Sequence, residues 1–582
     1  MSSLRFPGLG PIVGHTTPST CRIWIRADDP HDEGARLASA RRTIGVVAAY
    51  EGNGSPTKAP EVYYFRLHRE FDRTGTLNLG DEVGIVPDWD PAKRRGKSKH
   101  PLSLKPDAPY TAVVGTLTID DPFGDDETVT DDYLSHRLPE PNNLWPDLAK
   151  LFEKDRNRCS AIFRTFPHTG AKMADELSFI VGSCRYPGLL WKAKEADGIF
   201  GPLRNEAEGG TGRPKRRPTE FVIMVGDQIY ADMLNRHVPI GLADTFEEFQ
   251  ERYLTAFGSP NMSALLRRVP TYMILDDHEI EDNWTQDRVR KAESRRVFNL
   301  AIGAYMSYQW SHGPRTFGRR LYYTFESGGY PFFVLDTRTQ RFMDDVENSL
   351  DDNHMLGRPS MRGEEPSQLE RLLYWLKERQ DTSGDAPKFI VSSSVFVPNP
   401  MSARTGRSGA PQPNEDRKEM IQWMQDSDSW PAFPDTRRAI LRCILDNEIQ
   451  NVVFLSGDIH CSNVAEMRFS GSAAAEKLKA FSITSSAFYW PFFFADGDPS
   501  NYVHDSTEDD QRDTFLISES ESMNYKAWNF TQEDNYCRVD VDRNGARITV
   551  QPFDKEGNQI RKRDWHNQPT DRLIAKLQLA PW

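Results

Sequence analysis

The chain has 582 residues, of which 38% are hydrophobic and 27% are charged, and its formal net charge is −13. This length exceeds what one ordinary hydrophobic core accommodates, so we expect two domains or one large domain with additions. The acidic balance argues against general nucleic-acid binding, which needs a basic face.

The first residues contain no basic start followed by an apolar run and a cleavage site, so we expect no secretory signal. No apolar run reaches the length of a membrane span. Six cysteines in so long a chain do not make a disulfide framework, and we expect reduced thiols in a cytoplasmic setting. The basic stretch at residues 93–100 is expected to be a solvated loop. The oligomeric state stays open.

Alternating sequence dominates residues 1–172. In "CRIWIRA" the side chains of Cys21, Ile23 and Ile25 share one face, and "EVYYFRLHREF" and "YTAVVGTLTI" have a similar pattern. Such alternation is typical of antiparallel sheets that bury one face. We therefore predict an N-terminal all-β sandwich domain over residues 1–172.

From about Leu177 the apolar residues form continuous runs, which suit strands that are buried on both faces. The runs are "LSFIVGSC", "FVIMVGD", "TYMILDD", "PFFVLDT", "KFIVSSS", "NVVFLSGD" and "FSITSSA". Helical patterns lie between them, and Asp244 or Thr245 is expected to cap one helix and Ser367 another. Near the end, "YCRVDVDRNGARITVQPF" predicts a hairpin that turns at residues 544–545.

These elements predict an α/β fold for residues 173–582, a layered β-sandwich core flanked by helices. In open α/β sheets, ligands bind outside the carboxyl ends of the strands. The apolar runs end in side chains that can bind a metal ion or a phosphate: Cys184, Asp227, Asp276 to Glu279, Asp336, Ser392 to Ser394, Asp458 and His460. Carboxylates gathered in one cleft repel each other and are costly to desolvate, and bound cations offset that cost. The sequence therefore predicts a metal site.

Each of these residues also has a structural interpretation. A single aspartate after a strand is often a turn residue or a helix cap, and Asp336 fits that description. Cys184 could be a small buried apolar side chain, and a lone His278 could be structural. Recurrence favours the metal site, because His278 and His460 both follow an apolar run with an aspartate beside them.

Four motifs resemble those of a known family. The chain has "VGSCRYPG" at residues 181–188, "GDQIYAD" at 226–232, "DDHEIEDNW" at 276–284 and "SGDIHCS" at 456–462. In this order they resemble the calcineurin-like metallophosphoesterases, and within them the PhoD-like (alkaline phosphatase D) branch. Two departures from the general pattern are similar to that branch: "VGSCRYPG" stands in place of an Asp-x-His motif, and Asp277 stands in place of an asparagine.

The resemblance implies a PhoD-like metallophosphatase catalytic domain over residues 173–582 that holds two metal ions. Asp227 would bridge the two ions. Cys184 and Tyr230 would bind as thiolate and phenolate, which are ligands that suit Fe³⁺. The implied metal ligands are Cys184, Asp227, Tyr230, Asp277, Asp458 and His460.

The identity of the second ion is less constrained. Carboxylate oxygens suit a hard divalent cation, which would be Ca²⁺, Mg²⁺ or Mn²⁺. Which ligand serves which ion stays open. Asp276 could take the place of Asp277, and Asn283 is a weaker candidate.

The resemblance also implies a metal-dependent hydrolase of small-molecule phosphoric esters, either monoesters or diesters. Paired cations about 3.5–4 Å apart activate a bridging water and clamp phosphate oxygens. His278 is our choice for the general acid that protonates the leaving group, with Asp227 or Glu279 fixing its orientation. Arg185 and Arg338 could bind phosphate oxygens through their planar guanidinium groups, and surface salt bridges are the alternative for both.

Other functions stay open. One is a phospholipase-like phosphodiesterase that acts on lipid head groups, because an acidic chain disfavours DNA but not lipids. Another is a catalytically silent protein that keeps its metals for structure. The aromatic segment "AFYWPFFF" at residues 487–494 could be core packing or an apolar wall that favours a bulky ester group.

Overall fold

The computed structural model describes residues 4–28, 41–80, 102–124, 126–168, 170, 173–187, 193–210, 216–232, 242–318, 320–343, 353–403, 429–492, 497–564, 566 and 568–582. The expected basic loop at 93–100 lies outside these residues. No helix in the described part of the chain is long and apolar enough to cross a membrane.

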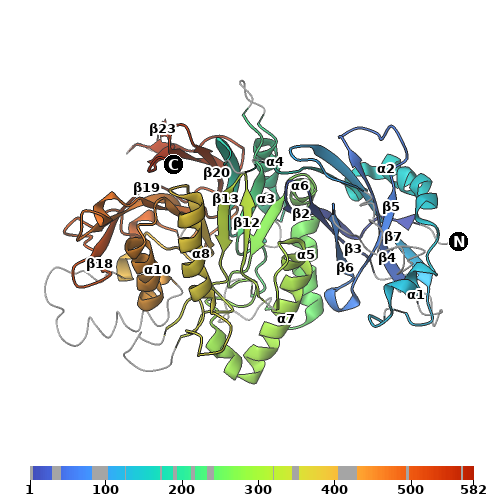
Figure 1. The fold of residues 1–582 in the computed structure, drawn as a ribbon, viewed down its shortest axis with the longest axis horizontal. Helices are drawn as coiled ribbons and strands as arrows, with labels where there is room; N and C mark the ends of the chain where they lie inside the picture. The colour runs from blue at the N-terminus through green and yellow to red at the C-terminus, as the bar shows by residue number, and fades with distance from the viewer. Residues whose placement is uncertain are drawn as a thin grey trace.

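The N-terminal region is a sandwich of two antiparallel sheets at one end of the molecule (Figure 1). One sheet has the strand order β1-β7-β4-β5 with β8 paired to β7, and the other has the order β2-β3-β6. Helices α1 (Asp131–Ser135) and α2 (Trp145–Cys159) pack on the outer face of the first sheet. The strands are β1 (Leu4–Arg5), β2 (Leu9–Thr16), β3 (Cys21–Arg26), β4 (Arg41–Glu51), β5 (Val62–Arg66), β6 (Thr74–Leu79), β7 (Pro109–Asp120) and β8 (Ser160–Arg164).

The rest of the described chain is built around two larger sheets. A six-stranded sheet has the order β11-β10-β9-β20-β21-β24, and an eight-stranded sheet has the order β12-β13-β14-β15-β17-β16-β19-β18. The strands of the first are β9 (Glu176–Gly182), β10 (Phe221–Val225), β11 (Thr271–Ile274), β20 (Asn535–Asp542), β21 (Arg547–Asp554) and β24 (Ala575–Gln578). The strands of the second are β12 (Tyr323–Ser327), β13 (Tyr330–Val334), β14 (Lys388–Ser392), β15 (Val452–Ser456), β16 (Ser462–Ser470), β17 (Ala480–Thr484), β18 (Phe515–Leu516) and β19 (Ser522–Thr531). Strands β22 (Arg561–Arg563) and β23 (Pro569–Arg572) form a separate pair.

The two larger sheets lie face to face over one apolar core. Phe179 of the six-stranded sheet packs edge-on against Phe332 and Phe389 of the other, with ring centroids 5.5 and 5.4 Å away. Each sheet contains a run of neighbouring parallel strands, namely β9, β10 and β11 in one and β13, β14, β15 and β17 in the other. Their carboxyl ends therefore gather at one edge of each sheet.

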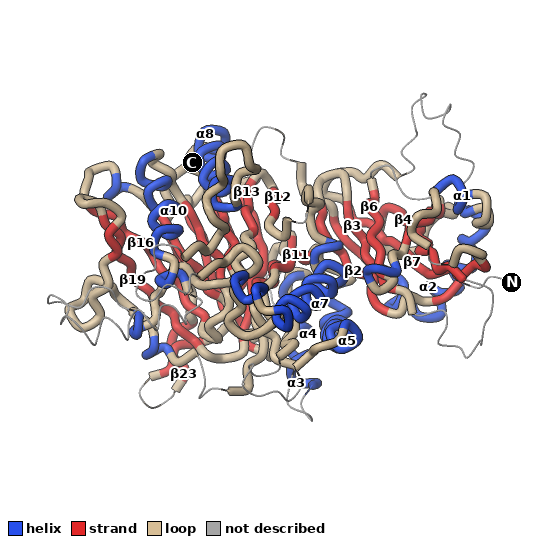
Figure 2. The backbone as a smooth tube through the Cα atoms, turned by 90° about the horizontal axis from the view of Figure 1, so that it is seen from below, coloured by secondary structure: helices blue, strands red, loops and turns tan. Residues whose placement is uncertain are grey.

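Helices cover both outer faces of this sandwich (Figure 2). Helices α4, α5, α6 and α7 pack on the six-stranded sheet, with α3 beside α4 and α6, and helices α8 and α10 pack on the eight-stranded sheet. Their bounds are α3 (Ala193–Gly198), α4 (Phe200–Ala207), α5 (Phe246–Gly258), α6 (Pro260–Leu266), α7 (Ala292–Tyr308), α8 (Gln368–Ser383) and α10 (Pro434–Asp446). The predicted α/β class, with a layered β-sandwich core between helices, is confirmed.

Local signals set several of these boundaries. Thr245, not Asp244, is the N-cap of α5, because its side chain accepts a hydrogen bond from Glu248 N in a capping box. Ser367 caps α8 in the same way. The predicted C-terminal hairpin joins β20 to β21, and β20 pairs antiparallel with β9. Strands from the C-terminal part of the chain therefore belong to the same six-stranded sheet as β9, β10 and β11.

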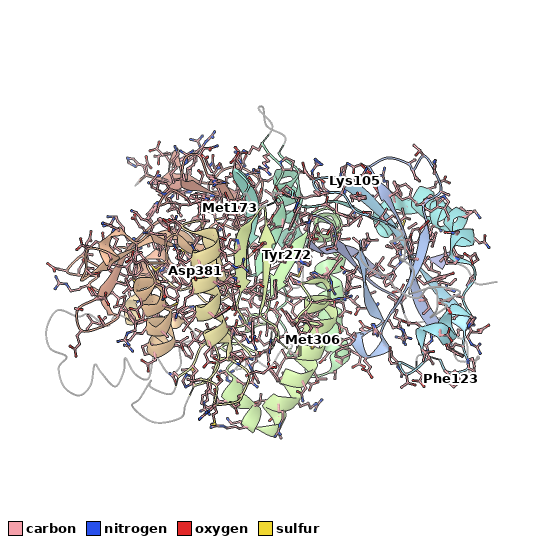
Figure 3. The ribbon with its side chains drawn as sticks, in the orientation of Figure 1. Lys105, Phe123, Met173, Tyr272, Met306 and Asp381 are labelled. Carbon is pink, nitrogen blue, oxygen red and sulfur yellow. The ribbon has the colours of Figure 1, made fainter. Side chains whose placement is uncertain are left out.

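The N-terminal sandwich packs against the second region through the outer face of β3, where the alternating pattern suggested an uncovered face. Trp24 is fully buried, donates its Nε1–H to Ser307 O at 2.9 Å, and lies 5.8 Å from the ring of Tyr308. Nearby, the hydroxyl of Tyr272, labelled in Figure 3, lies 3.1 Å from His15 Nδ1. Both faces of β3 are therefore buried. The domain boundary between residues 172 and 173 stays a prediction.

Acidification is expected to lower the stability of the protein through a buried histidine near this contact. His312, in the short helix Trp310–His312, is fully buried beside β2, and burial and the charge of Arg22 lower its pKa to about 3. The unfolded chain takes up this proton below about pH 6.5 whereas the folded chain does not. The free energy of unfolding should therefore fall as the pH drops, by at most about 2 kcal/mol between pH 7 and pH 5 for this group.

Urea titrations at pH 7 and pH 5 measure this effect. The variant His312→Phe keeps a buried ring without a titrating nitrogen, so its loss of stability over the same pH range should be smaller by about that amount. Equal losses for the two proteins would contradict the assignment.

Candidate metal centre

Four parallel strands deliver polar side chains to one place. Cys184 follows β9, Asp227 follows β10, and Asp276 follows β11. Asp458 and His460 follow β15. At four of these positions the backbone turns sharply with a left-handed φ of 50–70°, a conformation that non-glycine residues adopt mainly where the surroundings enforce it: Cys184, Asp227, Asp458 and His460.

Four carboxylates form the centre of the site. One oxygen each from Asp227, Asp276, Asp277 and Asp458 lies within 4.8 Å of all the others. Asp227 Oδ1 and Asp276 Oδ2 are buried and accept no hydrogen bond from any described residue. Burial, followed by the neighbouring Cys184 and carboxylates, raises the pKa of Asp227 well above its ordinary value. A cluster of this kind is unfavourable by itself and is stabilised by bound cations.

The thiol of Cys184 touches this cluster. Its Sγ lies 3.4 Å from Asp227 Oδ2, 3.6 Å from the carbonyl oxygen of Asp458 and 3.2 Å from Ser486 Oγ. Burial raises the pKa of Cys184 to about 12. A thiolate at this position therefore needs a cation beside it. The interpretation of Cys184 as ordinary core packing does not account for its place against a carboxylate.

Tyr230 and His460 meet on another side of the cluster. The Tyr230 hydroxyl lies 3.3 Å from His460 Nε2. Burial and the nearby charge of His278 lower the pKa of His460 to about 3, so its imidazole is neutral, which is the form that binds metals. Burial and Asp227 raise the pKa of the Tyr230 phenol well above its ordinary value, so the phenolate also requires a cation.

His278 is held by a residue that the sequence did not single out. Its Nδ1 lies 2.8 Å from Asp232 Oδ1, and Asp232 Oδ2 accepts the backbone N–H of Asp282 at 2.6 Å. Burial alone would lower the pKa of His278, but Asp232 and Asp277 raise it to about 10. These two carboxylates therefore favour the charged form of the ring, in which both nitrogens carry a proton. Asp232 could have been noticed as the last residue of "GDQIYAD".

Glu279, one of the two residues expected to orient His278, has a different position. Its carboxylate accepts the backbone N–H groups of Asp227, Gln228 and Asp276 at 2.6–3.1 Å, and the side-chain amide of Gln309 at 3.1 Å. Glu279 therefore fixes the backbone of two strand ends. The orientation of His278 comes from its contact with Asp232 and not from Glu279 or Asp227.

A buried chain of contacts links Glu279 to the N-terminal sandwich. Gln309 Nε2 also lies 3.1 Å from the hydroxyl of Tyr253, and the ring of Tyr253 stacks on that of Tyr308 at 4.7 Å. The Tyr308 hydroxyl donates to Asp72, next to β6. The N-terminal sandwich thus contacts, through three intervening side chains, the carboxylate that supports the metal centre.

The two arginines that were candidates for phosphate binding occupy different environments. Arg338 is fully buried, and its guanidinium pairs with Asp276 and lies 3.3 Å from Asp277 Oδ1 and 3.8 Å from Asp458 Oδ1. The Arg185 guanidinium instead donates to Ser259 Oγ at 3.2 Å and lies over the ring of Phe200. The structure brings Arg338 to the carboxylates and directs Arg185 toward the helices.

The remaining candidates are accounted for by backbone contacts. Asn283 donates its backbone N–H to Asp277 Oδ2 at 2.7 Å. Asp336 Oδ1 accepts the backbone N–H groups of Arg338 and Thr339, so it is a turn residue. Of the expected ligands, the six predicted positions and Asp276 lie together in this centre.

The donor set fits metal ions. It offers carboxylates with unpaired oxygens, a neutral imidazole, a phenol and a thiol, and the phenol and the thiol reach their charged forms only with a cation beside them. Two facing sheets with helices outside, and a buried acidic centre at the strand ends, define an α/β sandwich protein with a candidate metal centre.

Comparison of the chain with known proteins supports the resemblance that the motifs indicated. The family model of the PhoD-like phosphatases matches residues 206–550, so the chain belongs to that family. Alkaline phosphatase D of Bacillus subtilis (strain 168) is 24% identical over 335 residues, which are 54% of this chain and 51% of that protein. The chain thus matches about half the length of this relative.

A solved structure of PhoD is also similar, with a TM-score of 0.57 over 95% of this chain and 88% of that one, at 15% sequence identity. At that identity the likeness establishes the fold. The resemblance inferred from the four motifs is confirmed. Cys184 and Arg185 lie before the residues that the family model matches, so their roles rest on the geometry of the site.

Proposed function

We propose that this protein is a metal-dependent hydrolase of phosphoric esters. The observation that carries the proposal is the position of a histidine held by a buried carboxylate, His278 on Asp232, directly beside a carboxylate centre suited to cations. The membership of the PhoD-like phosphatase family supports the same reaction. A small-molecule phosphate ester is the proposed substrate, and phosphomonoesters and phosphodiesters are both to be tested.

The residues that would hold the metals are those of the centre. Cys184, Tyr230 and His460 suit Fe³⁺, and the carboxylates suit a harder cation such as Ca²⁺, Mg²⁺ or Mn²⁺. When bound, such cations polarise the phosphoryl group and lower the pKa of a water molecule. Arg338 holds Asp276, Asp277 and Asp458 at one position and offsets their repulsion.

His278 supplies a proton in this scheme. Its Nδ1–H is engaged by Asp232, so the proton on Nε2 is the one that can be transferred to the leaving oxygen of the ester. The Asp232 carboxylate fixes the ring and stabilises its charged form. This arrangement separates the histidine that donates a proton, His278, from the neutral one that can bind metal, His460.

The direct test is hydrolysis by the purified protein with and without a chelator. Phenyl phosphate, bis(p-nitrophenyl) phosphate and a phosphatidylcholine vesicle represent a monoester, a diester and a lipid head group. Metal-dependent release of phosphate or alcohol from at least one of them is expected. A protein that retains its metals and hydrolyses none of them would be the silent metal-binding protein instead.

All six cysteines are free and buried, which supports a reducing compartment such as the cytoplasm as its location.

An aromatic wall beside the centre suggests which esters are preferred. Trp490 stacks on His460 with ring centroids 3.7 Å apart, and Tyr186 and Phe492 lie 5.7 and 5.1 Å from Trp490. Trp490 and Phe492 are only partly buried. Residues 493 and 494 of the same segment lie outside the described residues. We propose that this wall contacts the organic group of the ester.

The variant Trp490→Ala should lower kcat/KM for phenyl phosphate about 3- to 10-fold and leave glycerol phosphate nearly unchanged, because aromatic contacts contribute about 0.5–1.5 kcal/mol each. Trp490→Phe should retain most of the preference. Metal content is measured alongside, since Trp490 also supports His460. An equal loss for both esters would show that the residue only supports the centre.

A further inference from the structure

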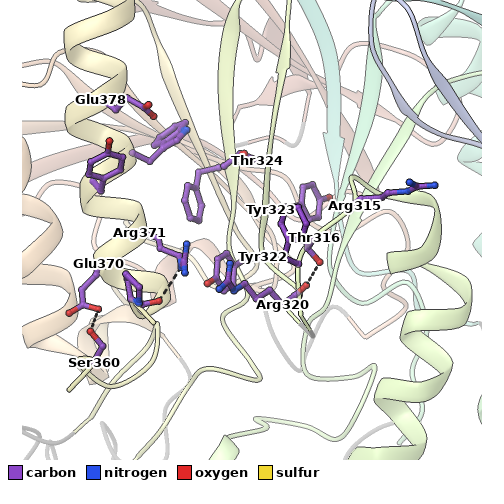
Figure 4. Close-up of a pocket in the computed structure, with 15 residues that line it drawn as sticks. Arg315, Thr316, Arg320, Tyr322, Tyr323, Thr324, Ser360, Glu370, Arg371 and Glu378 are labelled. Carbon is purple, nitrogen blue, oxygen red and sulfur yellow. Dashed lines mark hydrogen bonds between the residues drawn. The ribbon is translucent and has the colours of Figure 1, made fainter. Parts of the chain in front are cut away.

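A hollow lies at the edge of the eight-stranded sheet. It has a volume of about 650 Å³ and opens between helix α8 and residues 315–317 and 320–324, over the outer face of edge strand β12 (Figure 4). Its size is within the range of small-molecule sites. None of its lining residues belongs to the metal centre. It is therefore a separate place on the molecule.

The hollow has an aromatic floor and rim. Tyr322 lies parallel to Phe333 with centroids 6.2 Å apart, and Phe333 packs edge-on against Trp375 at 5.5 Å. At the rim, Phe317 is 88% exposed and Tyr374 is 69% exposed. These are two of the six large hydrophobic side chains that are exposed in the described part of the chain. A flat apolar ring placed in the hollow would cover this surface.

Two arginines meet across the hollow. Arg320 comes from the segment before β12 and Arg371 from the first turn of α8, and Figure 4 shows both reaching toward Tyr322. Arg371 is fixed by a hydrogen bond from its Nε to Pro366 O at 3.0 Å. The guanidinium groups of both arginines contact the same carboxylate oxygen, Oε2 of Glu365, although the Glu365 side chain is 79% exposed.

We propose that this hollow binds a small flat aromatic anion, with its ring on the Tyr322–Phe333–Trp375 floor and its acidic group between Arg320 and Arg371. Glu365 is a group from the chain itself whose carboxylate contacts both guanidinium groups. Because it is exposed and tethered only by a loop, an incoming sulfonate, carboxylate or phosphate can displace it. Arginine pairs bind such groups strongly because each guanidinium offers several donors in one plane.

The test is isothermal titration of the full chain with naphthalene-1-sulfonate, an aromatic anion without a phosphoester bond. One molecule should bind per chain. Arg371→Met should weaken binding about tenfold or more, since it removes a charge-assisted contact. Glu365→Gln should tighten binding about 3- to 10-fold, since it removes the competing carboxylate. Glu365 is exposed, so this variant is expected to fold normally.

Two control ligands measure the contributions of the aromatic ring and of the anionic group separately. 1-Naphthol and sodium sulfate should each bind at least about tenfold more weakly than the combined probe. Lys377→Met, on α8 but lining a different hollow beside α10, should bind the probe as the parent protein does. Binding that is unchanged in both Arg371→Met and Glu365→Gln would overturn the proposal, as would equal affinity for 1-naphthol. Neither result depends on whether phosphoric esters are hydrolysed.

Discussion

Replacing His278 by alanine is expected to lower kcat by a factor of about 10² to 10⁴, the usual contribution of a positioned general acid. The metal content should stay at the level of the parent protein, because the carboxylates, Cys184 and His460 remain. The physical reason is the loss of a proton held at Nε2 by the partnership with Asp232. Stopped assays with phenyl phosphate, together with metal analysis by mass spectrometry, measure both quantities.

Two further variants show whether the effect is specific. Asp232→Asn should also reduce kcat, by less than His278→Ala, because the ring stays but loses its charged partner. His136→Ala, at an exposed position in the N-terminal region, should leave kcat unchanged. Full activity in His278→Ala would remove the acid role, and a parallel loss of metal would assign this histidine to metal binding.

Replacing Asp227 by asparagine is expected to remove both the metals and the activity. The variant should lose more than about 100-fold in metal affinity, which exceeds the 10- to 100-fold effect typical of residues that only support ligands. The effect of this variant on stability should depend on whether metal is present. Without metal, Asp227→Asn should be at least as stable as the parent protein, because it removes one of four mutually repelling buried carboxylates. With metal, it should lack the increase in Tm that ligand binding confers.

Thermal unfolding in the presence and absence of a chelator provides this comparison. Asp121→Asn is the matched control, since Asp121 is equally buried but pairs with Arg42 in the N-terminal sandwich. This control should keep its metals and lose stability, because Arg42 would be left without its charged partner. Full metal occupancy in Asp227→Asn would refute the central position of Asp227.

The sequence predicted the elements whose signals are local. Continuous apolar runs identified the buried parallel strands, and the capping residues Thr245 and Ser367 marked helix starts. The strand-end position of Cys184, Asp227, Asp277, Asp458 and His460 followed from the general rule that ligands bind at the carboxyl ends of parallel strands. The structure brings these residues into one centre because the parallel strands of the two facing sheets end there.

What the sequence could not predict depends on pairing across long separations. Asp232 is the last residue of a motif quoted from the sequence, but its role depends on a partner, His278, that is 46 residues away. Trp24 lies on the opposite face of its strand from Cys21, Ile23 and Ile25, and the packing of the sandwich on the second region, α7 included, buries it. Arg185 and Arg338 both follow strands, but their side chains take different directions that depend on neighbours from other parts of the chain.

The proposed function requires that side chains from separate strands jointly bind cations. Anomalous X-ray diffraction from crystals of the active protein, recorded at the iron edge and at a longer wavelength, tests it directly. We expect anomalous peaks beside the Asp227 carboxylate, with an iron signal next to Cys184 Sγ and Tyr230. Active crystals in which this position carries no peak, or in which the metals lie elsewhere, would contradict it.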